Sequence, residues 1–335
     1  MTIRVGVIGT GGIGTDHATK LATSIAGSTV SVVTDINRAR AEEVAAGLDG
    51  ARVVEDGLEL IASDDVDAVL IASIGETHAA YTLACIAAGK PVLCEKPLAP
   101  TTEECLAVLE AEVAHGKRLV IVGFMRRYDP GYRQVKASLD SGGIGDALIV
   151  HNVHRNPSVP DYFTSYMTMT DSIIHEVDTS RWLLGEEIVS VQVVPPKRTP
   201  NAAADFQDPQ FALFTTESGV LSTVEFFANC QYGYDVRCEV VGSEGTASLL
   251  NPVVAGQIAA GADSSPVPPN WRVRFGAAYQ AELQAWISGL GRGEIVGPSA
   301  WDGYAATRVT EVGVEAVKTG NRTAIDYIAR PGLYG

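Results

Sequence analysis

A chain of 335 residues is long enough for two domains with substantial cores. Its hydrophobic fraction of 46% and charged fraction of 19% are those of an ordinary globular protein. The formal net charge of −15 disfavours nucleic acid and anionic membranes as partners, because both are bound by basic patches.

The five cysteines are scattered and show no C-x-x-C spacing, so the sequence predicts neither a disulfide framework nor a metal site. We find no apolar run long enough to cross a bilayer and no signal segment that follows a basic start. These features lead us to expect a cytoplasmic protein without membrane contacts.

A strand is expected at residues 3–8, and it ends in the fingerprint Gly9-Thr10-Gly11-Gly12-Ile13-Gly14, after which a helix begins. In this G-x-G-x-x-G pattern the first glycine allows a tight turn, the second lets the backbone approach a pyrophosphate, and the third permits close helix–strand packing. The next strand, residues 30–34, leads into Asp35, about 20 residues beyond the last glycine, where a carboxylate can hold the adenosine ribose. Together these features predict an NAD site.

Strands and helices continue to alternate as far as Gly123. The expected strands lie at residues 51–55, 67–73, 91–94 and 118–123, and the expected helices at 38–48, 77–88 and 101–115. This alternation predicts an α/β Rossmann domain over residues 1–123, whose parallel sheet binds ligands beyond the carboxyl ends of its strands.

Two segments should lie at that edge of the sheet, Ser73–His78 and Glu95-Lys96-Pro97. A residue before proline is pushed towards extended backbone, so Lys96 should leave its strand rather than enter a helix. There its ammonium group can donate to a substrate oxygen. His78 is more often a structural residue at a helix start than a catalyst. The candidate cofactor-binding residues are Gly9, Gly11, Gly12, Ile13, Gly14, Asp35, Arg38, Ser73, His78, Glu95 and Lys96.

The pattern changes after Gly123. A helix is expected to about residue 139, then a strand at 147–156 and a helix at 171–184. Several strands follow without helices between them, at residues 188–194, 211–217, 220–229, 235–241 and 245–250. A small-residue loop at 255–269 precedes two final helices, at 279–290 and 301–318. We therefore predict a second, α+β domain over residues 124–335 with a mainly antiparallel open sheet, whose free face needs a covering subunit or helices.

Asp171 and His175 are four residues apart in the expected helix, so they should share one face with Cβ atoms about 5–6 Å apart. That spacing suits a histidine that moves a proton and a carboxylate that orients it. Polar groups so spaced can also be solvated or core residues. The upstream fingerprint and Lys96 favour the catalytic interpretation.

A dinucleotide fold, a Glu-Lys-Pro strand end and a D-x-x-x-H helix before a β-sheet domain together resemble the glucose–fructose oxidoreductase/inositol dehydrogenase/MocA family. The resemblance covers essentially the whole chain. Four later runs are similar to the bacterial myo-inositol 2-dehydrogenases within that family: residues 123–129 (GFMRRYD), 154–157 (HRNP), 229–235 (NCQYGYD) and 297–304 (GPSAWDGY).

The resemblance implies a homotetrameric, NAD-dependent enzyme of polyol catabolism that oxidises myo-inositol to 2-keto-myo-inositol (scyllo-inosose). It makes Lys96, Asp171 and His175 the catalytic set. The implied substrate-binding residues are Lys96, Arg126, Asn156, Asp171, His175 and Tyr234. The chain departs from the family at residues 74–76, where Ile-Gly-Glu replaces a common Trp-Gly-Pro.

Three other functions stay open at this point. A related NAD-dependent enzyme can oxidise another cyclic polyol or sugar, such as scyllo-inositol, D-chiro-inositol or glucose. A glycoside hydrolase that uses transient NAD redox chemistry occurs on the same fold, but with different motifs in the substrate domain. A non-catalytic dinucleotide sensor has no need of the Lys96, Asp171 and His175 set.

Overall fold

The computed structural model describes residues 2–250, 256–259 and 261–335, which divide into two compact units. The first unit contains the chain up to residue 125 together with residues 279–307 and 327–335, and the second contains residues 126–278 and 308–326. Both units are therefore discontinuous in sequence, whereas the boundary expected from the sequence is a single cut after residue 123.

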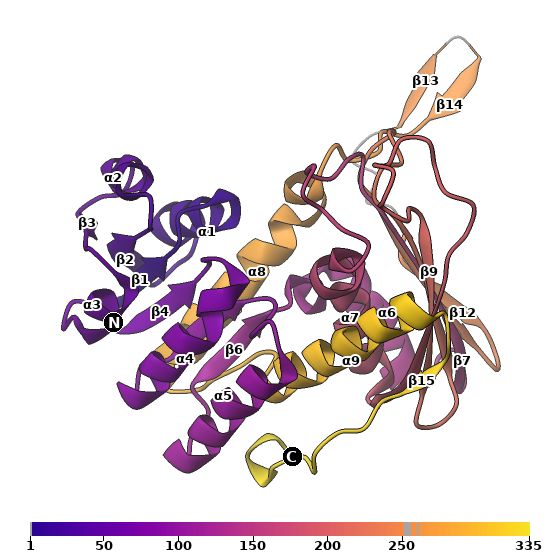
Figure 1. The fold of residues 1–335 in the computed structure, drawn as a ribbon. Coiled ribbons are helices and arrows are strands. Elements are labelled where there is room, and N and C mark those ends of the chain that lie inside the picture. Colours follow the sequence, from indigo (N-terminus) through magenta and orange to yellow (C-terminus); the bar gives the residue numbers. More distant parts are fainter. Residues whose placement is uncertain (1, 251–255, 260) are drawn as a thin grey trace. The chain divides into compact units, whose positions relative to one another are not determined.

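The first unit is built on a six-stranded parallel sheet with the order β3-β2-β1-β4-β5-β6 (Figure 1). The strands are β1 (Ile3–Ile8), β2 (Ser28–Thr34), β3 (Arg52–Val53), β4 (Ala68–Ile71), β5 (Val92–Glu95) and β6 (Val120–Gly123). The strand order reverses direction between β1 and β4, which is the switch point where doubly wound sheets bind dinucleotides. The predicted Rossmann fold is confirmed.

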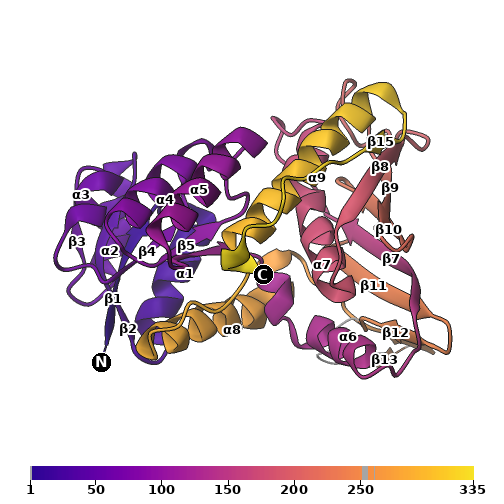
Figure 2. The ribbon, with the colours of Figure 1, turned by 90° about the horizontal axis from the view of Figure 1, so that it is seen from below.

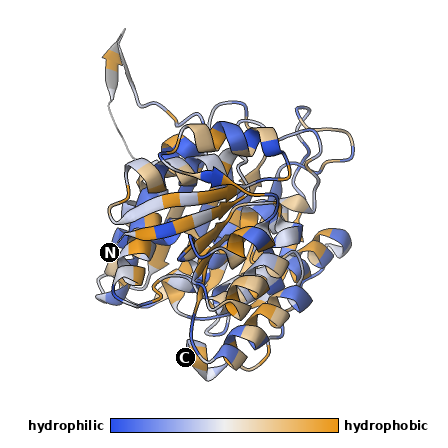
Figure 3. Ribbon diagram, turned by 90° about the vertical axis from the view of Figure 1, so that its left-hand side faces the viewer, coloured by the Kyte–Doolittle hydropathy of each residue, from blue (hydrophilic) through white to orange (hydrophobic). Residues whose placement is uncertain are grey.

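Helices cover both faces of this sheet. They are α1 (Gly12–Thr23), α2 (Arg38–Ala46), α3 (Gly57–Ala62), α4 (His78–Ala87), α5 (Thr102–His115) and the parts of α8 (Trp271–Gly291) and α9 (Ala300–Thr319) that belong to this unit. Leu283 and Trp286 of α8 share one buried cluster with Leu21 of α1 and Val5 of β1. Every residue of β4, β5 and β6 is buried, as expected for parallel strands covered by helices. The helices in Figure 3 carry both hydrophilic and hydrophobic colours.

The second unit is built on a seven-stranded sheet with the order β12-β11-β7-β10-β9-β8-β15. Its strands are β7 (Ala147–Arg155), β8 (Ile188–Val194), β9 (Gln210–Thr216), β10 (Leu221–Phe227), β11 (Asp235–Gly242), β12 (Thr246–Ser248) and β15 (Thr323–Ala324). All neighbours are antiparallel except β7 and β10, which pair in parallel. The predicted mainly antiparallel sheet is confirmed, with this one exception.

The helices of the second unit lie on one face of its sheet (Figure 2). They are α6 (Pro130–Asp140), α7 (Ile174–Leu184) and the last part of α9. Towards these helices the strands place fully buried residues such as Phe214, Val224 and Phe226. Alternate residues such as Leu213, Glu225 and Phe227 are only partly buried. Among the described residues of this unit, no helix covers that second face.

Two predictions near the C-terminal end of the second unit were wrong in detail. The expected loop at 255–269 contains a two-stranded hairpin, β13 (Gln257–Ala259) and β14 (Ala262–Ser264), although residues 255 and 260 lie outside the described part of the chain. Helix α8 begins at Trp271, eight residues before its expected start at 279. Within the described residues, no helix is both long and apolar enough to cross a membrane.

Candidate active site

The three glycines of the fingerprint are needed for three different reasons. Gly9 has a φ of +92°, and a Cβ there would lie 2.5 Å from the Ser73 amide nitrogen. A Cβ at Gly14 would lie 2.0 Å from the Gly9 carbonyl oxygen. At Gly11, by contrast, a Cβ would meet no protein atom within 4 Å. Gly9 and Gly14 are thus required by the fold, whereas Gly11 leaves open space in front of the helix α1 N-terminus, where a pyrophosphate is bound in such folds.

A cavity of about 470 Å³ opens beside this loop. Six of its lining residues were predicted to bind the cofactor: Gly9, Gly11, Gly12, Ile13, Asp35 and Ser73. The others were not predicted as cofactor contacts, although Ile74 and Thr77 belong to the segment Ser73–His78 that was expected at this edge of the sheet: Ile8, Thr34, Ile36, Arg40, Glu55, Asp56, Gly57, Ala72, Ile74, Thr77 and Tyr81. Ile36 is fully exposed although it is apolar, which suits a surface that a flat adenine ring covers. Its position directly after Asp35 was the one signal that the sequence offered.

Asp35 is held in place by its own loop. Its Oδ2 accepts hydrogen bonds from the Thr10 amide (2.6 Å) and hydroxyl (3.0 Å), and its Oδ1 accepts from the Asn37 amide (2.8 Å). Desolvation opposes ionisation, but these hydrogen bonds outweigh it and hold the pKa of Asp35 below its ordinary value. The carboxylate is therefore fixed and charged at the cavity wall, where it fits the hydroxyls of an NAD ribose.

Arg38 does not line the cavity. Its guanidinium bonds Glu42 (2.9 Å) and Glu55 (2.5 Å) on the exposed surface. Arg40, two residues further on, is the arginine of the lining. Arg38 is predicted from its position near Asp35, but its guanidinium is engaged by Glu42 and Glu55, of which only Glu55 lines the cavity.

The predicted residues His78, Glu95 and Lys96 lie outside the lining of this cavity as well. His78 is buried between the carbonyl groups of Pro97 and Ser73. Glu95 is also buried, and it bonds His17, a residue of α1 that the sequence analysis overlooked. Lys96 follows the end of β5, in the non-helical position that Pro97 led us to expect, and its side chain is partly exposed.

In the second unit, the segment expected as one helix from Asp171 to Leu184 is in two parts. Residues Thr168–Ile173 form a π-helical turn, and α7 begins only at Ile174 and runs to Leu184, where Gly185, with a φ of +72°, caps it. Asp171 is exposed on the π-helical turn, whereas His175 is nearly buried in the first turn of α7. Such π-helical turns are frequent at functional sites, and the wider spiral could not be foreseen from side-chain spacing.

Both arginines that follow Met125 are bound to carboxylates of α7. Arg126, 1% exposed, forms an ion pair with Glu176, which is also 1% exposed. Arg127 bonds both oxygens of Asp178, at 3.0 and 2.5 Å. Burial alone would raise the pKa of Glu176, but Arg126 and His154 hold it below its ordinary value.

The predicted substrate residues Tyr234 and Asn156 border the same region. The Tyr234 hydroxyl lies 3.5 Å from Nε2 of His154, whose Nδ1 lies 3.1 Å from Glu176 Oε2. Burial raises the pKa of Tyr234. Asn156 is partly buried directly after β7, where its backbone N–H donates to the Phe227 carbonyl and its backbone carbonyl accepts from the Cys230 N–H. Glu176 and His154 were missed because their partners are distant in sequence.

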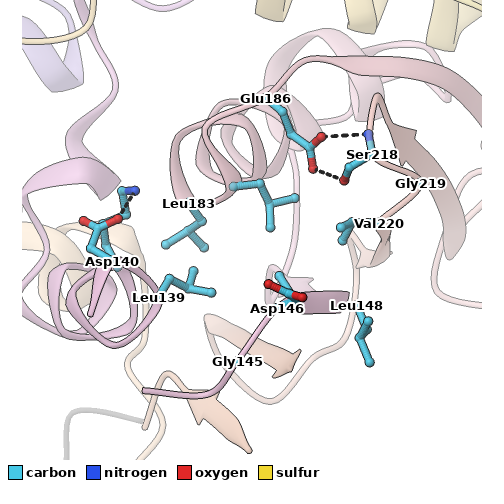
Figure 4. A pocket seen from close by; sticks show the side chains of 13 residues that line it. Leu139, Asp140, Gly145, Asp146, Leu148, Leu183, Glu186, Ser218, Gly219 and Val220 are labelled. Carbon is cyan, nitrogen blue, oxygen red and sulfur yellow. Dashed lines mark hydrogen bonds and ion pairs between the residues drawn. The ribbon is translucent and has the colours of Figure 1, made fainter. Parts of the chain in front are cut away.

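A second cavity, of about 680 Å³, lies in the second unit but contains none of the predicted residues (Figure 4). Its wall combines four leucines, one valine and one alanine with two glycines, Ser218 and four charged residues, Lys136, Asp140, Asp146 and Glu186. Glu186 accepts from the Ser218 amide and hydroxyl, both at 2.8 Å, and Lys136 bonds Asp140 at 2.6 Å. The carboxylates of Glu186 and Asp140 are thus engaged within the lining itself, and no residue proposed for the reaction lies among them. Among the described residues, no group of three or more His, Cys, Asp or Glu side chains could hold a metal ion.

Known proteins resemble the chain over its whole length. It is 52% identical to Inositol 2-dehydrogenase 3 of Saccharopolyspora erythraea, over 100% of this chain and 99% of that protein. It is 50% identical to Inositol 2-dehydrogenase of Pseudomonas syringae pv. syringae, over 100% of both chains. The crystal structure of myo-inositol dehydrogenase from Lactobacillus casei in complex with NAD(H) and myo-inositol matches with a TM-score of 0.97 and 36% identity, over 100% of both chains.

A second solved structure, scyllo-inositol dehydrogenase from Lactobacillus casei with bound NAD(H) and scyllo-inositol, matches with a TM-score of 0.90 and 26% identity, over 97% of this chain and 99% of that chain. Residues 3–124 match the family model described as the oxidoreductase family with an NAD-binding Rossmann fold. Residues 132–248 match the model of the GFO/IDH/MocA C-terminal domain. With its fingerprint loop, its cofactor cavity and both domain matches, the chain belongs to the GFO/IDH/MocA family of oxidoreductases.

Proposed function

We propose that this protein is an NAD-dependent inositol 2-dehydrogenase, which oxidises myo-inositol to 2-keto-myo-inositol. The observation that carries this conclusion is identity of about half of all residues, over the full length, with proteins named inositol 2-dehydrogenase. The fixed Asp35 carboxylate and the open space at Gly11 agree with NAD as the cofactor.

We propose Lys96, Asp171 and His175 as the catalytic residues. Bound NAD supplies the acceptor for the hydride that leaves the alcohol carbon. The His175 imidazole takes the hydroxyl proton as general base, and Asp171 orients the imidazole and stabilises its protonated form. The Lys96 ammonium donates to the alcohol oxygen and stabilises the negative charge that develops there.

The engaged arginines support an uncharged substrate. A guanidinium pair could have clamped a carboxylate or phosphate, which was the strongest objection to a polyol. Arg126 and Arg127 are instead bound to Glu176 and Asp178. A polyol needs several neutral donors and acceptors, and we propose that Asn156 and Tyr234 are among them. Arg126 is the predicted substrate contact that the geometry favours least, because its guanidinium is buried and ion-paired.

Oxidation of scyllo-inositol is the second candidate, because scyllo-inositol dehydrogenase is also structurally similar. The test is kcat/KM with NAD for myo-inositol, scyllo-inositol, D-chiro-inositol, glucose and a sugar phosphate. We expect myo-inositol to give the highest value, since its axial hydroxyl at C2 presents an equatorial hydrogen that scyllo-inositol lacks. A higher value for any other compound would replace the proposed substrate.

We further propose that residues 1–123 bind NAD, that residues 124–335 bind the polyol, and that the enzyme is a cytoplasmic homotetramer. The partly buried sheet face that carries Leu213 and Phe227 suits contact with a second copy. The five free cysteines suit a reducing compartment. A mass of about 35 kDa by light scattering at micromolar concentration, that of a single chain, would exclude the assembly.

A further inference from the structure

Two buried histidines of the first unit have no part in the proposed reaction, yet each is bonded to a residue next to Lys96. His17 is 0% exposed and belongs to α1, the helix that follows the glycine fingerprint. His78 is 1% exposed and begins α4, seven residues after the end of β4 at Ile71. An aliphatic residue fills a core position at lower desolvation cost, so two buried imidazoles call for a reason.

His17 is connected to the backbone of Lys96 through the Glu95 side chain. Its Nε2 lies 2.7 Å from Glu95 Oε1, and the Lys96 amide donates to Glu95 Oε2 at 3.2 Å. Because a carboxylate oxygen accepts, Nε2 of His17 must carry a proton. Gly123 leaves room for this carboxylate, since a Cβ at residue 123 would lie 3.0 Å from Glu95 Oε2. The Glu95 side chain thus joins helix α1 to the backbone of Lys96.

His78 contacts the backbone of Pro97, the residue on the other side of Lys96. Its Nδ1 lies 2.7 Å from the Pro97 carbonyl oxygen, and its Nε2 lies 3.2 Å from the Ser73 carbonyl oxygen. Both carbonyls accept, whereas a neutral imidazole has only one N–H to donate. Burial lowers the pKa of His78, so the ring is neutral at pH 7, and the shorter contact identifies Nδ1 as the donor.

Both histidines also connect to the cofactor cavity. Helix α1 begins at Gly12, and Ser73 lines the cavity in contact distance of Gly9. We propose that His17 and His78 are positioning residues for Lys96, which fix the backbone on either side of it and tie it to the segments that hold NAD. This inference rests on the proposed function, in which the Lys96 ammonium meets the substrate oxygen.

The geometry predicts that a different amide side chain preserves the hydrogen bond at each position, Gln at residue 17 and Asn at residue 78. The amide nitrogen of Gln can take the place of histidine Nε2, and that of Asn the place of Nδ1. His17→Gln should therefore keep the bond to Glu95 while His17→Asn loses it. At residue 78 the order is reversed, because His78→Asn keeps the bond to Pro97 and His78→Gln does not. A change that only loosened the core would not follow this order.

The first measurement is steady-state kinetics with NAD and myo-inositol, together with NAD binding by titration calorimetry. We expect kcat to fall at least about tenfold in His17→Asn and His78→Gln and by less than about threefold in His17→Gln and His78→Asn, since misplacement by about 1 Å can cost about a hundredfold. The dissociation constant of NAD should stay within about threefold in all four variants. Equal loss for Asn and Gln at each position, or loss of kcat and NAD affinity together, would overturn the proposal.

A second measurement does not depend on turnover. The rate at which acetic anhydride acetylates Lys96, followed by mass spectrometry of the free protein, should change at least about threefold in the two impaired variants, because the Lys96 backbone is no longer held. Exposed Lys117 is the internal control, and the exposed His115→Gln is the matched variant, for which no change is expected. Unchanged Lys96 labelling in both impaired variants would contradict the positioning role. If the wild type oxidised no inositol, the proposed function would be wrong. The labelling of Lys96 would still test whether the two histidines position that residue.

Discussion

The cofactor cavity and the start of α7 differ in how their charged side chains are held in place. The cavity beside the fingerprint is lined by glycines of the loop, and its Asp35 carboxylate is held by hydrogen bonds from the neighbouring residues Thr10 and Asn37. These groups follow one another closely along the chain. A region built in this way is specified by local order of residues, and a ligand can approach it without displacing side chains.

The start of α7 is held instead by charged side chains that are distant in sequence. Arg126 and Arg127 bind Glu176 and Asp178, 50 and 51 residues later. In the same unit, Arg274 of α8 binds Asp129, the N-cap of α6, across 145 residues at 2.7 Å. All six groups are largely buried, and the charges balance as three ion pairs. The removal of one partner leaves an unpaired charge in a dry site.

The difference teaches which changes each region tolerates. Around the cavity, a substitution should alter binding of NAD with little effect on stability, unless a glycine is needed by the fold. Around α7, a substitution in an ion pair should alter stability first. Substitutions of the proposed catalytic residues should lower turnover and leave both NAD binding and stability unchanged.

The largest effect is expected for the proposed base. His175→Ala should lower kcat by about 10²–10⁴, the usual contribution of a positioned general base, while the dissociation constant of NAD stays within about threefold. Lys96→Ala should lose a comparable rate, because the oxygen loses its cationic donor. Stopped-flow reduction of NAD and calorimetric titration measure the two quantities. Wild-type turnover in His175→Ala would leave Lys96 as the better candidate for the base.

The second effect tests the ion pairs of α7. Glu176→Gln leaves Arg126 buried without its anion, and we expect a loss of about 3–5 kcal/mol in the free energy of unfolding, measured with urea. The matched control is Arg292→Gln, which breaks the exposed pair with Glu294 and should cost less than about 1 kcal/mol. Similar losses in the two variants would remove the contrast between buried and exposed pairs.

Much of the first unit could be predicted from its sequence because its signals are local. Gly9, Gly11, Gly14 and Asp35 follow from strand, turn and helix order alone, and the cavity includes all of them except Gly14, which packs beneath the loop. Helix α3 was missed although Asp56 caps it through bonds to the Leu58 and Glu59 amides, because six residues are too few to show a helical period.

Less of the second unit could be predicted from the sequence, because its decisive contacts join residues that are distant along the chain. The Arg126–Glu176 pair and the parallel pairing of β7 with β10 join residues that no spacing rule connects. The π-helical turn that carries Asp171 depends on packing and not on side-chain period. The sequence could therefore name Asp171 and His175 as candidates without revealing what holds them.

The third effect concerns cofactor choice. A 2′-phosphate near Asp35 would bring like charges together, so we expect kcat/KM with NAD to exceed that with NADP by about tenfold to a hundredfold. Asp35→Ser should narrow this ratio, with Arg40 of the cavity wall available to the phosphate. Thermal unfolding should change little, which is the control. Equal efficiency of the two cofactors in the wild type would reject the assignment of Asp35.

The fourth effect separates the glycines. Gly11→Ala should fold normally, because its Cβ meets no atom and its φ of −66° suits any residue, yet we expect NAD affinity to fall about tenfold as the methyl group meets the pyrophosphate. Gly14→Ala should instead lower the free energy of unfolding by about 1–3 kcal/mol, because its Cβ would overlap the Gly9 carbonyl. Calorimetric titration and urea unfolding of both variants give the comparison, and a destabilised Gly11→Ala would contradict it.

The smallest effect distinguishes the two regions by pH. Burial lowers the pKa of His78 below its ordinary value of about 6.5, so the unfolded chain binds the proton more tightly than the folded chain does. Stability should therefore fall as the pH drops below about 6.5, by at most about 1.4 kcal/mol per pH unit, until the folded-state pKa is reached.

Glu176 of the second unit titrates in a lower pH range, because it is a carboxylate whose pKa is lowered in the folded chain. The stability that it contributes is present above its unfolded pKa of about 4.3 and is lost only as the pH falls further. Between pH 7.5 and 5.5 Glu176 should accordingly contribute no loss of stability, whereas His78 should. His78→Asn removes the titrating ring but can keep the bond to Pro97, so its free energy of unfolding should fall by about 1 kcal/mol less than that of the wild type over this range. Equal losses in the two proteins would mean that His78 binds a proton equally well in the folded and unfolded chains.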